Sequence, residues 1–189
     1  SDPTWCRGRD AYYLANSSFE YFPGAPIFRS EDLETWTQIG NVIDRPEQTP
    51  LLGAGASAGI FGSTLRFHDD TYWFITTNID TVRDGQQIFT AKDPEGPWSD
   101  AVVVPGTAGI DPDLYWDADG TCYLSWTRMG IQQAKVDPVA GVLLSEPQPL
   151  WNGVGMKAPE GPHIYHVGEW YYLLIAEGGT ERGHCVSIA

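Results

Sequence analysis

Three acidic residues stand at matching points of the sequence, each beside a proline and just before a segment expected to form a strand. The three motifs are Asp2-Pro3, Asp111-Pro112-Asp113 and Pro159-Glu160-Gly161-Pro162. Proline fixes the dihedral angle φ and withholds a backbone donor, which suits a chain that turns rigidly into a first strand. If these strands converge, close approach of the carboxyl groups keeps at least one of them protonated at neutral pH.

Such a cluster contains the groups that glycoside hydrolysis needs. One carboxylate activates a water molecule and one carboxylic acid protonates the leaving oxygen. Taken singly, Asp-Pro and Glu-Gly are also ordinary turn dipeptides. Their recurrence at one phase of a repeat favours a catalytic role over a simple turn.

The strands that must position these acids form a repeat of about 50 residues. Each copy has a short apolar strand, an acidic or glycine-containing turn, and a strand rich in Tyr and Trp. Equivalent tyrosines lie 60, 51 and 48 residues apart, at Tyr12, Tyr72, Tyr123 and Tyr171. A period of this length with paired strands is typical of a β-propeller. An irregular β-sandwich whose hairpins merely look alike is the alternative.

We therefore predict an all-β propeller whose blades cover about residues 1–50, 51–108, 109–157 and 158–189, the last one incomplete. Three and a half to four blades do not close a ring comfortably, and closure is what removes exposed sheet edges. We expect an N-terminal portion of a longer protein, in which the remaining blade or blades complete the ring. We also expect residues 1–189 alone to be inactive.

The composition fits one globular, all-β domain. Of the 189 residues, 42% are hydrophobic and 13% are aromatic, and 21 Gly and 14 Pro interrupt nearly every window that a helix could occupy. A formal net charge of −14, from 25 acidic and 11 basic residues, repels polyanions, so neither nucleic acid nor a membrane surface is an expected partner. No apolar stretch approaches the roughly 20 residues that span a bilayer.

The cysteines favour neither a metal site nor a disulfide framework. Cys6, Cys122 and Cys185 are an odd, widely spaced set without a CxxC pair. This pattern favours a reducing cytoplasm, with secretion as the alternative if a leader precedes Ser1. The acid–base chemistry requires no cofactor. A calcium ion in the central channel is an alternative, although no set of ligands in the sequence supports it. The role of His184 is also open.

Five motifs, taken in order, resemble glycoside hydrolase family 43, and in particular its β-xylosidases and α-L-arabinofuranosidases. The resemblance spans the whole chain and implies a five-bladed β-propeller that inverts the anomeric configuration of a neutral oligosaccharide. The motifs are Asp2-Pro3-Thr4, residues 19–27 (FEYFPGAPI), residues 109–114 (GIDPDL), residues 157–162 (KAPEGP) and residues 176–180 (AEGGT).

The resemblance also implies roles for individual residues. Asp2 corresponds to the general base, Glu160 to the general acid, and Asp111 to the residue that tunes the pKa of the acid and orients it. Three residues are expected to bind the sugar in the innermost subsite: Phe19, Phe61 and Ile110. Relatives often carry Trp-Ala-Pro where this chain has Phe61-Gly62-Ser63, so the choice between xylose and arabinose is open. A substrate-binding arginine and a C-terminal β-sandwich are expected later in the whole protein.

Two other functions stay open. A sialidase-like glycosidase is suggested by residues 30–36 and 91–98, which loosely resemble Asp-box turns, but the arginines do not stand at the inner-strand entrances where a sialidase needs them. A non-catalytic carbohydrate-binding propeller would retain Phe19 and Phe61 without needing acids at three entrances.

Overall fold

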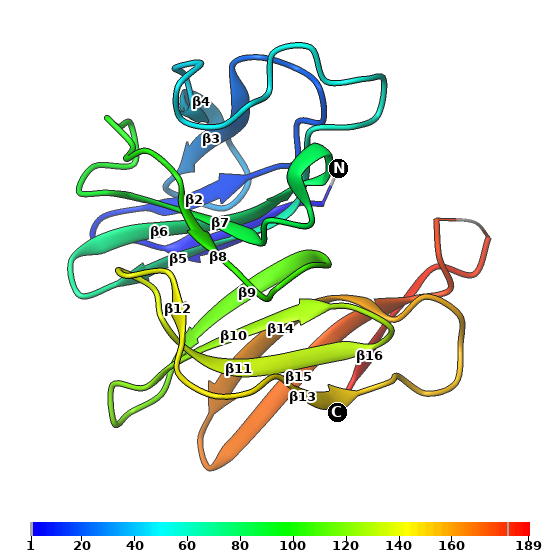
Figure 1. Cartoon of the computed structure of the whole chain (residues 1–189). Helices are drawn as coiled ribbons and strands as arrows, with labels where there is room; N and C mark the ends of the chain where they lie inside the picture. The colour runs from blue at the N-terminus through cyan, green and yellow to red at the C-terminus, as the bar shows by residue number, and fades with distance from the viewer. Residues whose placement is uncertain (1, 181) are drawn as a thin grey trace.

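The computed structural model describes residues 2–180 and 182–189. These residues form four antiparallel sheets, each built from consecutive strands and arranged as blades of a β-propeller (Figure 1). This confirms the predicted all-β propeller. The only helical element in the described residues is a short 3-10 turn at Ile79–Thr81, and no helix there is long and apolar enough to cross a bilayer.

Each blade begins with its inner strand and proceeds outward. Blade 1 has the order β1 (Thr4–Arg7), β2 (Tyr12–Ala15), β3 (Gly24–Ser30) and β4 (Thr37–Ile43). Blade 2 has the order β5 (Ile60–His68), β6 (Thr71–Asn78), β7 (Gln86–Ala91) and β8 (Val102–Val104).

The last two blades depart from this plan at their outer edges. In blade 3, both short outer strands pair with the third strand: β9 (Ile110–Trp116), β10 (Cys122–Thr127), β11 (Ile131–Asp137), β12 (Val142–Leu143) and β13 (Gln148–Trp151). Blade 4 has three strands within the described residues: β14 (Glu160–Val167), β15 (Trp170–Glu177) and β16 (Cys185–Ile188).

Local sequence sets the inner hairpins. In blade 2, His68 pairs with Thr71 across a two-residue turn, and both turn residues, Asp69 and Asp70, have positive φ. Type I′ hairpin turns require positive φ at both positions, and Asp tolerates that conformation better than most residues. The acidic turn of the repeat therefore closes the hairpin and fixes its register.

Aromatic side chains from the first and second strands pack between neighbouring blades. Tyr13 and Tyr72 pack edge to face between blades 1 and 2, with ring centroids 5.2 Å apart. Trp73 and Trp116 lie 5.2 Å apart between blades 2 and 3. Burying a large apolar side chain stabilises a fold by about 1.5–3 kcal/mol, so these contacts hold neighbouring blades at fixed angles.

Inner strands are also linked to one another by side-chain hydrogen bonds. The hydroxyl of Thr4 in β1 accepts from the backbone N–H of Leu65 in β5 at 3.1 Å. The hydroxyl of Thr64 in β5 donates to the carbonyl of Pro112 in β9 at 2.9 Å. These bonds connect the inner strands of blades 1, 2 and 3.

A buried ion pair links blades 2, 3 and 4. Arg66 Nη2 lies 2.6 Å from Asp113 Oδ1, and the Asp113 side chain is fully buried. The second oxygen of Asp113 accepts from the N–H of Ile164 at 2.8 Å, while Arg66 donates to the Ile164 carbonyl. A buried charge is tolerated when it is paired and fully hydrogen-bonded, so this network fixes β14 against β9.

Candidate active site

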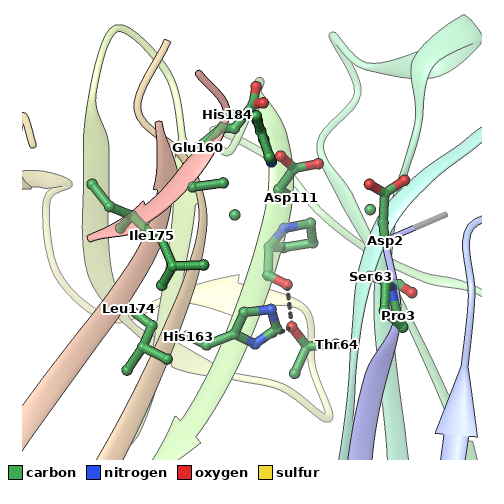
Figure 2. Close-up of a pocket in the computed structure, with 15 residues that line it drawn as sticks. Asp2, Pro3, Ser63, Thr64, Asp111, Glu160, His163, Leu174, Ile175 and His184 are labelled. Atoms are coloured by element: carbon green, nitrogen blue, oxygen red, sulfur yellow. Dashed lines mark hydrogen bonds between the residues drawn. The ribbon is translucent and has the colours of Figure 1, made fainter. Parts of the chain in front are cut away.

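One pocket opens where the inner strands begin, and the three predicted acids lie around it. Asp2 precedes β1, Asp111 is the second residue of β9, and Glu160 is the first residue of β14. The cavity has a volume of about 370 Å³. Figure 2 shows Asp2 and Glu160 on opposite sides of the pocket, with Asp111 between them. The fold thus brings together residues that are far apart in the sequence.

Backbone conformation aims the two aspartates. Asp2 has a φ of 49° and Asp111 a φ of 54°, both in the left-handed region that few residues other than glycine adopt. Each is followed by proline, which disfavours the right-handed helical conformation in the residue before it. Outside turns, non-glycine residues held in this strained region cluster at functional sites, which agrees with the position of these two side chains.

The carboxyl group of Asp2 is oriented by a hydroxyl group. Ser17, which is buried just after β2, donates from Oγ to Asp2 Oδ2 at 2.7 Å. Such a bond limits rotation of a carboxylate at the exposed rim of a pocket. Sequence reasoning did not identify Ser17, because only the packing of blade 1 brings it to the N-terminal segment.

Burial and mutual repulsion keep a proton in the site. Burial, together with the negative charges of Glu160 and Asp2, raises the pKa of Asp111 to about 7, against a hydrogen bond from the Gly161 N–H that lowers it. Burial also raises the pKa of Glu160, while the nearby His184 lowers it and the charge of Asp2 raises it. The resemblance to the family implies a retained proton at Glu160, the general acid. The structure adds Asp111 as a second group that binds a proton near neutral pH.

Replacing Asp111 by Asn is therefore expected to stabilise the fold at alkaline pH. Below about pH 4 the carboxyl is protonated in both the folded and the unfolded chain. As pH rises to about 7, the unfolded chain releases this proton and the folded chain keeps it, so the wild type loses stability. We expect a gain of about 1–2 kcal/mol at pH 8, after allowing for partial exposure, and none near pH 4.

Thermal unfolding of the whole protein at the two pH values measures this effect. Asp10→Asn is a control for which we expect the opposite effect. Hydrogen bonds from Tyr13 and Arg29 lower the pKa of Asp10, so its negative charge stabilises the fold. Replacing Asp10 by Asn should therefore reduce stability at pH 8. A melting temperature of Asp111→Asn that equals the wild type at pH 8 would contradict an energetic cost of the Asp111 charge.

Two further pocket residues were not recognised as site residues in the sequence. His163 lies on the floor, where its Nδ1 is 3.4 Å from the Thr64 hydroxyl, and burial lowers its pKa, so its imidazole is neutral near pH 7 (Figure 2). The Ser63 hydroxyl is buried in the wall without a hydrogen-bond partner among the described residues. A buried hydroxyl that lacks a partner suits a hydrogen bond to a polar ligand. His184, whose role the sequence left open, lies beside Glu160 and has Nδ1 2.6 Å from the Gly179 carbonyl.

The three residues expected to bind the sugar do not line this pocket. Phe19 and Phe61 pack against each other edge to face, with ring centroids 5.8 Å apart, and Phe19 forms a β-bridge with Ile60. Ile110 pairs with Thr127 and precedes Asp111, and neighbouring side chains of a strand point to opposite faces. Their contact with a sugar stays a prediction.

The structure contains no obvious ligand set for the calcium ion that the sequence left open. Among residues 2–180 and 182–189, no three or more His, Cys, Asp or Glu side chains are grouped so that they could hold a metal ion.

Comparisons with known proteins place this geometry in a family. The chain is 43% identical over 188 residues to the non-reducing end alpha-L-arabinofuranosidase BoGH43B of Bacteroides ovatus, covering 97% of this chain and 35% of that protein. It is 40% identical to a xylosidase/arabinosidase of Butyrivibrio fibrisolvens, covering 100% of this chain and 39% of that protein. The chain thus spans less than two fifths of the length of these relatives.

Solved structures and a family sequence profile agree with these relatives. The structure of the Bacteroides ovatus xyloglucan PUL GH43B superimposes with a TM-score of 0.92 at 39% identity, over 99% of this chain and 38% of that one. The profile described as "Glycosyl hydrolases family 43" matches residues 1–189. The chain belongs to glycosyl hydrolase family 43.

Proposed function

We propose that the whole protein is an inverting glycosidase that releases xylose or arabinose from the ends of xylo- or arabino-oligosaccharides. The observation that carries this proposal is the meeting of Asp2, Asp111 and Glu160 around one pocket. The printed names of the relatives, a xylosidase/arabinosidase and an arabinofuranosidase, support the choice of sugars. These sugars are neutral, so the net charge of −14 does not oppose their binding.

The proposed reaction is a single displacement at the anomeric carbon. Asp2 accepts a proton from a water molecule as the water oxygen forms a bond to that carbon. Glu160 donates its proton to the glycosidic oxygen as the bond from the anomeric carbon to that oxygen breaks. Asp111 and Glu160 each oppose the ionisation of the other, so the pair retains a proton for the leaving oxygen near neutral pH. The positions of Asp2 and Glu160 on opposite sides of the pocket support this division of roles (Figure 2).

The two rival functions fit the pocket less well. A sialidase would hold its carboxylate substrate with arginine, but no arginine in the described residues lines this pocket, and Arg66 is bound to Asp113. A binding module does not need several carboxyl groups whose burial raises their pKa values, because that burial costs free energy of folding.

Assays with chromogenic glycosides test the proposal. The whole protein should hydrolyse 4-nitrophenyl β-D-xyloside, 4-nitrophenyl α-L-arabinofuranoside, or both, and the ratio of the two kcat/KM values should define its preference. Binding of xylo-oligosaccharides without hydrolysis of either glycoside would favour the carbohydrate-binding alternative instead.

The pH profile of activity tests the role of Asp111. Asp111→Asn removes a negative charge beside Glu160, so Glu160 should lose its proton at a lower pH than in the wild type. The alkaline limb of kcat/KM against pH should therefore move to lower pH. A limb that stays in place or moves to higher pH would argue against this role.

A further inference from the structure

A buried carboxylate outside the pocket has no part in the mechanism above. Glu177 is the last residue of β15, and its exposed fraction is 0%. Glutamate is almost never fully buried unless its charge is compensated. The surroundings of Glu177 therefore indicate what its charge does.

The compensation comes from Ser187 in β16 and from the loop between β13 and β14. The backbone N–H of Val154 donates to both carboxylate oxygens, at 3.1 and 3.2 Å. The hydroxyl of Ser187 and the N–H groups of Val154 and Met156 hold the pKa of Glu177 below its usual range, so it is ionised at neutral pH. Hydrogen bonds to an ionised acceptor are roughly twice as strong as those between neutral groups.

The loop is shaped for this contact. A Cβ atom on Gly153 would meet Glu177 Oε1 at 2.1 Å, and Gly153 has a φ of 78°, so glycine alone allows this close approach. On the other side of the loop, the N–H of Gly178 donates to the carbonyl of Lys157 at 2.8 Å. Residues 153–157 are therefore fixed at both ends by the end of β15.

The same loop leads directly into Glu160. After Lys157 the chain passes through Ala158, with a φ of 52°, and through Pro159, whose own φ is fixed by its ring. Little freedom is left between the anchored loop and Glu160. Glu160 pairs with Ala176, the residue next to Glu177, so both glutamates lie at one end of the β14–β15 ladder.

We propose that Glu177 is a positioning residue for Glu160: its carboxylate anchors residues 153–157 and so fixes where the Glu160 carboxyl meets the leaving oxygen. This proposal rests on the proposed function, in which Glu160 is the general acid. A misplacement of about 1 Å can cost about a hundredfold in rate, and a misplaced acid matters most when the leaving group needs protonation.

Kinetics of Glu177→Gln in the whole protein test this role. The amide keeps the size of the side chain but presents N–H groups where an acceptor is needed. We expect kcat on a phenyl glycoside, a poor leaving group, to fall about ten- to a hundredfold, and kcat on a 2,4-dinitrophenyl glycoside to fall less than about threefold. KM should change little. Equal losses on both glycosides, or no loss on either, would overturn the proposal.

Asp137→Asn is the matched control. The carboxylate of Asp137 also accepts from two backbone N–H groups of a loop, those of Val139 and Ala140, but it does not line the pocket. This variant should leave the ratio of the two rates unchanged. A ratio that shifts as much as in Glu177→Gln would show that any weakened loop produces the effect, which would overturn the specific role of Glu177.

Hydrogen exchange separates this proposal from the proposed function. Amides of Val154 and Met156 should exchange at least about tenfold faster in Glu177→Gln, whether or not the wild type hydrolyses any glycoside. Gly153→Ala, which disturbs the same contact from the loop side, should give the same pattern if Glu177→Gln does not fold. Unchanged protection of residues 153–157 in the folded variant would overturn the anchoring role.

Discussion

Replacing Asp2 by Asn in the whole protein is expected to reduce kcat by about 10²- to 10⁴-fold on every substrate, whatever its leaving group. Asn keeps the shape of the side chain and an oxygen that can accept from Ser17, whose hydroxyl lies 2.7 Å from Asp2 Oδ2, so the fold should be retained. The amide cannot take a proton from water. Every substrate needs that water, so the loss should not depend on the leaving group.

Two controls make this result specific. Ser17→Ala keeps the Asp2 carboxylate and removes only its orienting hydroxyl, so it should cost less than about tenfold. Azide, which is already an anion and needs no base, should partly restore turnover in Asp2→Asn and yield a glycosyl azide of inverted configuration. Activity of Asp2→Asn within tenfold of the wild type would rule out Asp2 as the base.

Glu160→Gln is expected to have an equally large effect, but only on some substrates. A leaving group of high pKa must be protonated as it departs, so the kcat of a phenyl glycoside should fall by about 10²- to 10⁴-fold. A 2,4-dinitrophenolate departs without protonation, so its glycoside should lose little. The slope of log kcat against leaving-group pKa measures this difference. Equal losses across the series would contradict the assignment of Glu160 as the acid.

Much of the fold could be predicted from local sequence. The spacing of Tyr12, Tyr72, Tyr123 and Tyr171 identified four copies of one hairpin, and each of these tyrosines lies in the second strand of its sheet. A turn such as Asp69-Asp70 and the aromatic strand after it are specified by neighbouring residues. Outer strands were harder to predict, because their pairing depends on contacts between distant segments. In blade 3, for example, β12 and β13 both pair with β11.

The candidate site was only partly accessible to the same reasoning. Asp2, Asp111 and Glu160 stand at one phase of the repeat, so a regular propeller brings them together. Ser17 and His163 carry no comparable signal, because packing within and between blades decides that Ser17 meets Asp2 and that His163 lines the pocket. The pKa of Asp111, about 7, likewise depends on burial and on neighbours that only the folded chain supplies.

The buried Arg66–Asp113 pair shows the same limit. The sequence shows Asp113 in one motif with Asp111 but indicates no role for it. In the structure Asp113 binds Arg66 and the N–H of Ile164, beneath the pocket. Asp111 lines the pocket, whereas Asp113 holds three blades together.

The stereochemistry of the first product tests the central claim most directly. Proton NMR of the whole protein acting on whichever glycoside it hydrolyses can follow the anomeric signal before the free sugar equilibrates. If Asp2 activates water while Glu160 protonates the leaving oxygen, the first sugar released should have the anomeric configuration opposite to that of the substrate. If the first sugar released instead has the same anomeric configuration as the substrate, the reaction requires two displacements through a covalent intermediate. That result would contradict the roles assigned to Asp2 and Glu160.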